Sequence, residues 1–135
     1  MAEKARVLVV DDEVLIVKLL GKHLEAAGFE VLSAFDGQQG LEKARGERPE
    51  LIILDLILPK LNGYEVCTLL KQDARYQHIP IVVCTAKVQE QDEALGMQCG
   101  ANVYLRKPLD IRVLLDHVTR LARAPRAPSR DTVSS

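Results

Sequence analysis

The sequence lacks tryptophan altogether, and aromatic residues make up only 4% of its 135 positions. No apolar run approaches the roughly 18 residues needed to cross a bilayer, and no long apolar segment precedes a small-residue cleavage site at the N-terminus. The formal net charge is only −1, so no overall basic field would draw the chain to nucleic acid or to an anionic membrane. These absences predict a cytoplasmic protein with no direct contact to nucleic acid or membrane.

Cysteine is also scarce, with three widely spaced copies. Cys67, Cys84 and Cys99 are odd in number and form no CxxC pair, which argues against a disulfide framework and against a metal knuckle. We interpret them as small buried apolar residues, with a redox-sensing thiol as the alternative. The histidines at positions 23, 78 and 117 lack metal-ligand spacing and are expected on the surface or on helix faces.

The rest of the composition suits one folded domain. Hydrophobic residues make up 47% and charged residues 27%, as in ordinary globular proteins. From about Ala124 the chain continues as APRAPSRDTVSS, which is rich in alanine, proline and serine and has no apolar periodicity. We therefore expect a domain over residues 1–123 and a flexible tail or interdomain linker over residues 124–135.

Short apolar runs alternate with segments of helical periodicity along the domain. The runs are residues 6–10, 30–34, 51–55, 81–85 and 101–105. The predicted helices cover residues 14–27, 39–45, 64–70, 89–99 and 109–122, with Gly28 and Gly100 as left-handed terminators of the first and fourth. Because the runs are apolar throughout, they indicate parallel strands in a sheet that helices cover on both faces.

Two of the predicted strands end on carboxylates. Asp11 and Asp12 follow the run RVLVV, and Asp55 closes the run LIILD. Ligands of open α/β sheets bind beyond the carboxyl ends of the strands, so neighbouring strands would bring these acids into one pocket. Two ionised carboxylates about 4 Å apart repel by roughly 4 kcal/mol at an effective dielectric of about 20. Such a group requires either an added proton or a cation, and carboxylate oxygens suit Mg²⁺.

A simpler interpretation of the acidic pair is that Asp12 caps the first helix while the helix dipole favours Glu13. Other polar groups nevertheless point to the same edge of the sheet. Thr85 and the small Ala86 follow the fourth run, and Lys107 follows the fifth. A hydroxyl, an ammonium, an acidic pair and a separate acid together form a set suited to phosphoryl transfer.

Four blocks of the sequence resemble the signature blocks of bacterial response-regulator receiver domains: VLVVDDE, LIILDLILPKLNGYEV, IPIVVCTA and GANVYLRKP. The resemblance runs from about residue 5 to residue 122 and keeps the order of the blocks. It implies an α/β fold, the flavodoxin-like (βα)5 three-layer sandwich, whose five-stranded parallel sheet has the order 2-1-3-4-5. It also implies a signalling protein that is no enzyme beyond its own phosphoryl transfer and autodephosphorylation.

The resemblance assigns roles to individual residues. Asp55 would be the phosphoacceptor, attacking the phosphohistidine of a sensor histidine kinase or a histidine phosphotransfer protein. Asp12 and Asp55 would hold Mg²⁺ (or Mn²⁺) directly, Asp11 would hold it through water, and Ile57 would contribute its backbone carbonyl. An effector domain or a downstream protein would receive the signal.

Further roles follow for the residues after the fourth and fifth strands. Lys107 would pair with the phosphoryl oxygens, next to Ala86, and a cis peptide bond would join it to Pro108. Thr85 would move to bond a phosphoryl oxygen, and Tyr104 would then swing inward into the space beside Ala86. This two-state element would change the face made by the fourth helix, the fifth strand and the fifth helix.

One departure from the family concerns dimerisation. Receivers that pair through that face often carry acidic residues where this chain has Asn102 and Val103. We therefore expect a monomer or a weak phosphorylation-dependent dimer, although Arg112, Arg120 and Arg123 make the fifth helix basic.

Ile57 also bears on the lifetime of the product and on the rival functions. Its apolar side chain, two positions after the phosphoacceptor, would hinder attacking water, with Lys87 near the mouth, so a long-lived aspartyl phosphate is expected. A haloacid-dehalogenase-type phosphatase would instead need an acid at that position, in a DxDxT motif. The remaining alternative is a receiver-like interaction module that is never phosphorylated.

Overall fold

The computed structural model describes residues 4–86 and 99–122. Its strands form one parallel sheet in the order β2-β1-β3-β4-β5, which confirms the predicted architecture. The strands are β1 (Arg6–Val10), β2 (Glu30–Ala34), β3 (Leu51–Leu54), β4 (Ile81–Thr85) and β5 (Val103–Arg106). The helices of the described part are α1 (Val14–Ala26), α2 (Gly37–Glu47), α3 (Gly63–Lys71) and α5 (Ile111–Ala122).

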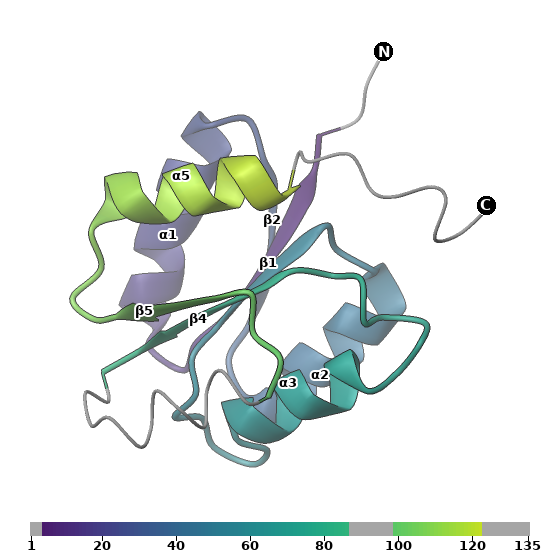
Figure 1. Cartoon of the computed structure of the whole chain (residues 1–135). Helices are drawn as coiled ribbons and strands as arrows, with labels where there is room; N and C mark the ends of the chain where they lie inside the picture. The colour runs from purple at the N-terminus through teal and green to yellow at the C-terminus, as the bar shows by residue number, and fades with distance from the viewer. Residues whose placement is uncertain (1–3, 87–98, 123–135) are drawn as a thin grey trace, which may run out of the picture.

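Helices cover both faces of the sheet. Figure 1 shows α1 and α5 on one face and α2 and α3 on the other. Successive side chains of a strand point to opposite faces, so Val7 and Val9 of β1 pack with α1 and α5, whereas Leu8 and Val10 pack with α2 and α3. Because the inner strands β3 and β4 are buried on both faces, all of their residues except Thr85 are apolar.

Local hydrogen bonds set the first residues of two helices. The Asp36 carboxylate accepts the backbone N–H of Gln39 at 2.8 Å, so α2 begins at Gly37 and not at residue 39 as predicted. Asp110 accepts the backbone N–H of Arg112 at 3.0 Å, and α5 begins directly after Asp110, not at residue 109. In both cases an aspartate side chain ends the loop by capping the helix.

The last strand also differs from its prediction, because β5 spans Val103–Arg106 and not residues 101–105. Asn102 accounts for the difference. Its backbone N–H donates to the carbonyl of Ile81 at 2.8 Å, and its side-chain oxygen accepts the backbone N–H of Ile81 at 2.9 Å. Asn102 thereby takes up the backbone groups of Ile81, the first residue of β4, and the regular pairing of β5 begins with Val103 opposite Val82.

Several other expectations bear on the turns and the core. Gly28 and Gly100 have φ angles of 95° and 97°, as predicted for left-handed residues. The three cysteines are buried free thiols, which confirms their interpretation as core residues. Of the helix predicted over residues 89–99, residues 89–98 lie outside the described residues and Cys99 lies in a turn; the tail over residues 124–135 also lies outside them. Of the helices described, none is both long and apolar enough to cross a membrane.

The connection from β3 to α3 is packed tightly under Asp55. The backbone N–H of Gly63 donates to the carbonyl of Leu56 at 3.0 Å, and a Cβ added at Gly63 would lie 2.2 Å from the carbonyl oxygen of Asp55. Asn62 and Glu65 form a capping box that fixes the start of the helix. Only glycine therefore allows α3 to begin this close to the end of β3.

We predict that Gly63→Ala destabilises the domain by about 2–3 kcal/mol, because the added methyl group collides with backbone that cannot move away. Gly46→Ala in α2 is the control, since nothing lies within 4 Å of a Cβ there. It should stabilise the domain by about 0.5–1 kcal/mol through helix propensity. Urea unfolding followed by circular dichroism measures both, and equal effects of the two substitutions would contradict the tight contact.

Candidate functional site

The carboxyl ends of the strands open into a hollow of about 490 Å³. Four separate loops line it with the side chains of Asp12, Glu13, Asp55, Ile57, Ala86 and Lys107. These loops meet because parallel strands all end at the same edge of the sheet. The structure therefore brings Asp12, Asp55, Ile57, Ala86 and Lys107, which the sequence analysis singled out, together at one place.

Three aspartates gather beside the hollow. Asp11, Asp12 and Asp55 each place a carboxylate oxygen within 4.8 Å of the other two. Asp11 and Asp55 are only 4% and 5% exposed, whereas Asp12 faces solvent. The backbone N–H of Asp11 donates to Ala34 and that of Asp55 to Val10, so both residues continue the pairing of their strands. The two buried carboxylates are thus held in place by the sheet itself.

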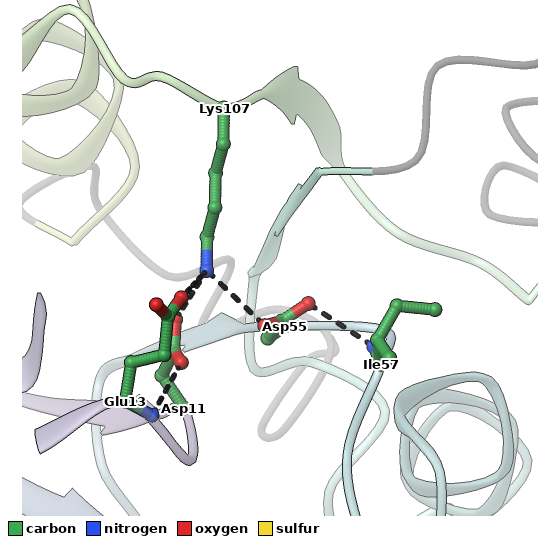
Figure 2. Close-up of polar contacts among 5 residues, drawn as sticks. All are labelled: Asp11, Glu13, Asp55, Ile57 and Lys107. Carbon is green, nitrogen blue, oxygen red and sulfur yellow. Dashed lines mark hydrogen bonds and ion pairs between the residues drawn. The ribbon is translucent and has the colours of Figure 1, made fainter.

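Lys107 reaches from the β5–α5 loop toward these acids, as Figure 2 shows. Its Nζ lies 2.7 Å from Oδ2 of Asp11 and 3.1 Å from Oδ2 of Asp55. Its backbone N–H donates to the carbonyl of Thr85 at 2.8 Å, which places the residue over the end of β4. The cis peptide predicted between Lys107 and Pro108 is present. The ammonium offsets part of the negative charge that the aspartates bring together.

Glu13 is the site residue that the sequence analysis missed. It lines the hollow, and its Oε1 lies 3.3 Å from Nζ of Lys107. The interpretation of Asp12 as a helix cap was wrong, because Glu13 occupies the N-cap position of α1 without a capping side-chain hydrogen bond. Instead, Oδ1 of Asp11 accepts the backbone N–H of Glu13 at 2.9 Å. A third acid in a row after a buried strand was the signal that could have identified it.

Burial and charge shift the pKa values of the two central groups. Burial raises the pKa of Asp55, and the charge of Asp11 raises it further. The backbone N–H of Ile57, which donates to Oδ1 at 3.0 Å, and the charge of Lys107 act in the opposite direction but do not cancel the rise. For Lys107, burial would lower the pKa, but the hydrogen bonds and charges of Asp11 and Asp55 outweigh it and the pKa is raised. Lys107 therefore stays charged, and any further positive charge nearby would stabilise the ionised form of Asp55.

The donor set fits a hard divalent cation. The clustered ligand atoms are all carboxylate oxygens, and the solvent-facing Asp12 leaves room for water ligands. Oxygen ligands of this kind suit Mg²⁺ or Mn²⁺ better than a softer metal. Ile57, predicted to contribute its carbonyl, lies at the same rim.

The two predicted switch residues, Thr85 and Tyr104, are not among the residues that line the hollow. Thr85 at the end of β4 is fully buried, and Tyr104 of β5 is partly buried. Val83 is the partner of Tyr104 across the two strands, so Thr85 and Tyr104 are diagonal neighbours on one face. This is the face that packs with α2 and α3.

The comparisons with known proteins agree with this geometry. The chain matches the model of the response regulator receiver domain over residues 7–119. It is 45% identical over 118 residues to the alkaline phosphatase synthesis transcriptional regulatory protein PhoP of Bacillus subtilis. It is 42% identical over 118 residues to the DNA-binding dual master transcriptional regulator RpaA of Synechocystis sp.. These matches cover 87% of this chain but 48% and 49% of the two relatives, so the chain spans about half the length of the curated relatives it matches.

Solved structures show the same fold. A putative response regulator from Chloroflexus aurantiacus is 30% identical, with a TM-score of 0.84 over 89% of this chain and 98% of that one. The chemotaxis protein CheY4 of Vibrio cholerae is 32% identical, with a TM-score of 0.81 over 88% of this chain and 99% of that one. The chain therefore belongs to the response regulator receiver domain family, the signalling domains of two-component systems.

We predict that Asp55→Asn stabilises the metal-free domain at neutral pH by about 1 kcal/mol. Because the pKa of native Asp55 lies above 3.8, the folded state binds its proton more tightly than the unfolded state does. The stability gained from this proton is present below pH 3.8 and is lost as the pH rises through the native pKa. At neutral pH the ionised carboxylate of Asp55 therefore destabilises the folded protein, and asparagine removes that effect.

Thermal unfolding between acidic and neutral pH, in the presence of a chelator, measures this difference. Asp36→Asn is the matched control, because Asp36 is also buried and asparagine caps a helix as well as aspartate does. A loss of stability in Asp55→Asn at neutral pH would contradict the predicted repulsion.

Proposed function

We propose that Asp55 is the phosphoacceptor of this receiver and that it receives the phosphoryl group of a phosphohistidine. The donor would be a sensor histidine kinase or a histidine phosphotransfer protein. An oxygen of Asp55 attacks phosphorus while the bond from phosphorus to the histidine nitrogen breaks, and the imidazole keeps the electron pair. The observation that carries this proposal is a buried carboxylate at an open hollow, 3.1 Å from the ammonium of Lys107.

The neighbours of Asp55 supply the charge that the transfer needs. A carboxylate attacks phosphorus poorly unless the negative charge of the phosphoryl oxygens is offset. Lys107 offsets part of it from its position above Asp11 and Asp55. Asp12 and Asp55 would hold Mg²⁺ or Mn²⁺ directly, Asp11 through water, and Ile57 through its carbonyl. When bound, the ion would supply further positive charge at the phosphoryl oxygens.

Phosphorylation would act on Thr85 and Tyr104. The phosphoryl group adds charge and strong acceptor oxygens at the rim where Thr85 ends β4. Rotation of the Thr85 hydroxyl toward it would open space on the shared face, and Tyr104 would turn inward beside Ala86. The change would appear on β5, α5 and the segment over residues 87–98, which lies outside the described residues.

The output would leave the domain through protein contacts. We propose that the receiver covers residues 1–123, that residues 124–135 form a tail or linker, and that an effector domain or a downstream protein carries the signal on. The names of the relatives indicate transcriptional output for those proteins. Any such output here would come from the effector domain or the downstream protein, because a net charge of −1 gives this chain no basic field that would attract DNA.

We further propose a cytoplasmic location and a monomer or weak phosphorylation-dependent dimer. The three free cysteines suit a reducing compartment. Asn102 makes hydrogen bonds with Ile81 within the domain, so it does not provide the acidic contact to a second copy that some receivers use for dimerisation. Arg112 and Arg120 are nevertheless exposed on α5.

We predict that acetyl phosphate with Mg²⁺ adds one phosphoryl group, about 80 Da, to the intact chain. The gain should disappear in Asp55→Asn and in the presence of a chelator, because both the nucleophile and the bound cation are needed. Intact mass spectrometry under acidic quench measures it. Asp36→Asn is the control, since this buried aspartate caps α2 away from the hollow and its variant should be phosphorylated like the parent.

Other results of that experiment select other functions. No gain of mass in the parent protein would favour the unphosphorylated interaction module. A mass gain that survives Asp55→Asn would remove Asp55 from the role proposed for it. Repeated turnover of unrelated phosphate esters would favour a phosphatase.

We predict that the aspartyl phosphate decays over minutes or longer. The apolar side chain of Ile57 lines the hollow and is 48% exposed, so it occupies space that a water molecule attacking Asp55 would use. Ile57→Asn should shorten the half-life several-fold by admitting and orienting water. The decay of the phosphorylated mass after removal of the phosphodonor measures both. A half-life of a few seconds in the parent protein would contradict the role of Ile57.

A further inference from the structure

Cys67 and Cys99 form a thiol pair that the phosphoryl site does not use. Cys67 lies in the middle of α3, and Cys99 lies in the turn before β5. The Cys67 thiol donates to the carbonyl oxygen of Cys99 at 3.4 Å, and the side chains of the two cysteines also influence each other's pKa. The sulfur of Cys67 thus lies against the backbone of Cys99, which brings the two cysteines together although they are 32 positions apart in the chain.

The two thiols differ in reactivity. The neighbouring Cys67 side chain lowers the pKa of Cys99 to about 7 despite burial, and the backbone N–H of Ala101 and the charge of Lys71 act in the same direction. The Cys99 side chain, together with burial, raises the pKa of Cys67. Cys99 is 8% exposed, whereas Cys67 is completely buried. Cys99 is therefore the thiol of the pair with the lowered pKa and the greater exposure, the two properties that favour reaction with an oxidant.

Lys71 is held close to the pair. Its ammonium donates to the carbonyls of Gln77 and Ile79 at 3.1 and 2.8 Å. Its side chain packs on Gly100, where an added Cβ would lie 2.9 Å from Cγ of Lys71. A fixed positive charge next to Cys99 favours the thiolate form.

Cys84 provides an internal contrast. It lies on β4 among the residues that pack with α1 and α5, whereas Cys67 and Cys99 pack with α2 and α3. Burial raises the pKa of Cys84 to about 12. Cys84 is thus a core thiol without a sulfur partner on its face of the sheet, among the residues described.

We propose that Cys67 and Cys99 are an oxidation site at which a hydroperoxide forms an intramolecular disulfide. The Cys99 thiolate attacks the terminal peroxide oxygen, the O–O bond breaks, and Cys99 becomes a sulfenic acid while the oxidant is reduced to water or an alcohol. The Cys67 sulfur then attacks the Cys99 sulfur, its proton leaves with the displaced hydroxide as water, and the S–S bond forms. In sum, two thiols are oxidised and one peroxide is reduced.

The chain is well suited to a direct test, because trypsin places each cysteine in a different peptide. Cleavage after lysine and arginine gives residues 61–71 with Cys67, 76–87 with Cys84 and 88–106 with Cys99. The reduced full chain is treated with hydrogen peroxide, remaining thiols are alkylated under denaturing conditions, and the digest is analysed without reductant. We expect a monomer that is lighter by about 2 Da before alkylation and a cross-link between the first and third peptides. Dithiothreitol should reverse both changes.

Variants separate this site from non-specific oxidation. Cys84→Ala should retain the cross-link, and Cys99→Ala should abolish it while leaving Cys67 available for alkylation. The disulfide should also raise the melting temperature of the parent protein by several degrees relative to its reduced form, because it closes a long loop. A cross-link through Cys84, a disulfide only between two chains, or sulfinic acid at Cys99 with Cys67 still alkylated would each overturn the proposal. None of these measurements depends on phosphorylation of Asp55.

Discussion

Repulsion between carboxylates that cannot move apart is the constraint on which the site depends. Asp11 and Asp55 continue the hydrogen bonding of β1 and β3, so the sheet fixes their separation. The charge that compensates them comes from Lys107, 96 positions away from Asp11 in the chain. The acidic cluster is therefore compensated only when β5 has joined the sheet and placed Lys107 at the same edge. The site thus depends on the folding of the whole domain.

The layered parallel sheet and the meeting of polar residues at one edge could be predicted from local patterns, whereas the strand order and the roles of single residues were implied only by the resemblance to receiver domains. Runs that are apolar at every position indicate buried parallel strands, and polar residues at the ends of those runs must meet at one edge. Contacts made through tertiary structure could not be predicted. The start of β5 depends on Asn102 bonding to Ile81, and the role of Glu13 depends on how closely Lys107 approaches it.

Membership of the receiver family and the individual character of this chain are separate matters. The family match and the structural neighbours show the fold and the family, whereas the three aspartates and Lys107 are observed in the structure of this chain. Ile57 at the rim and the thiol pair between α3 and the turn before β5 are features of this sequence. They concern how long a signal would persist and what other chemistry the domain meets, and not whether it folds as a receiver.

The hydrogen bond from the backbone of Lys107 to the carbonyl of Thr85 has a mechanical consequence. A shift of the backbone at Thr85 would also move Lys107 and would weaken the ion pairs of its ammonium with Asp11 and Asp55. Only a torsional change within the threonine side chain leaves that anchor undisturbed. A rotation of the Thr85 side chain, the movement proposed for the phosphorylated state, would therefore leave the hydrogen bond that positions Lys107 in place.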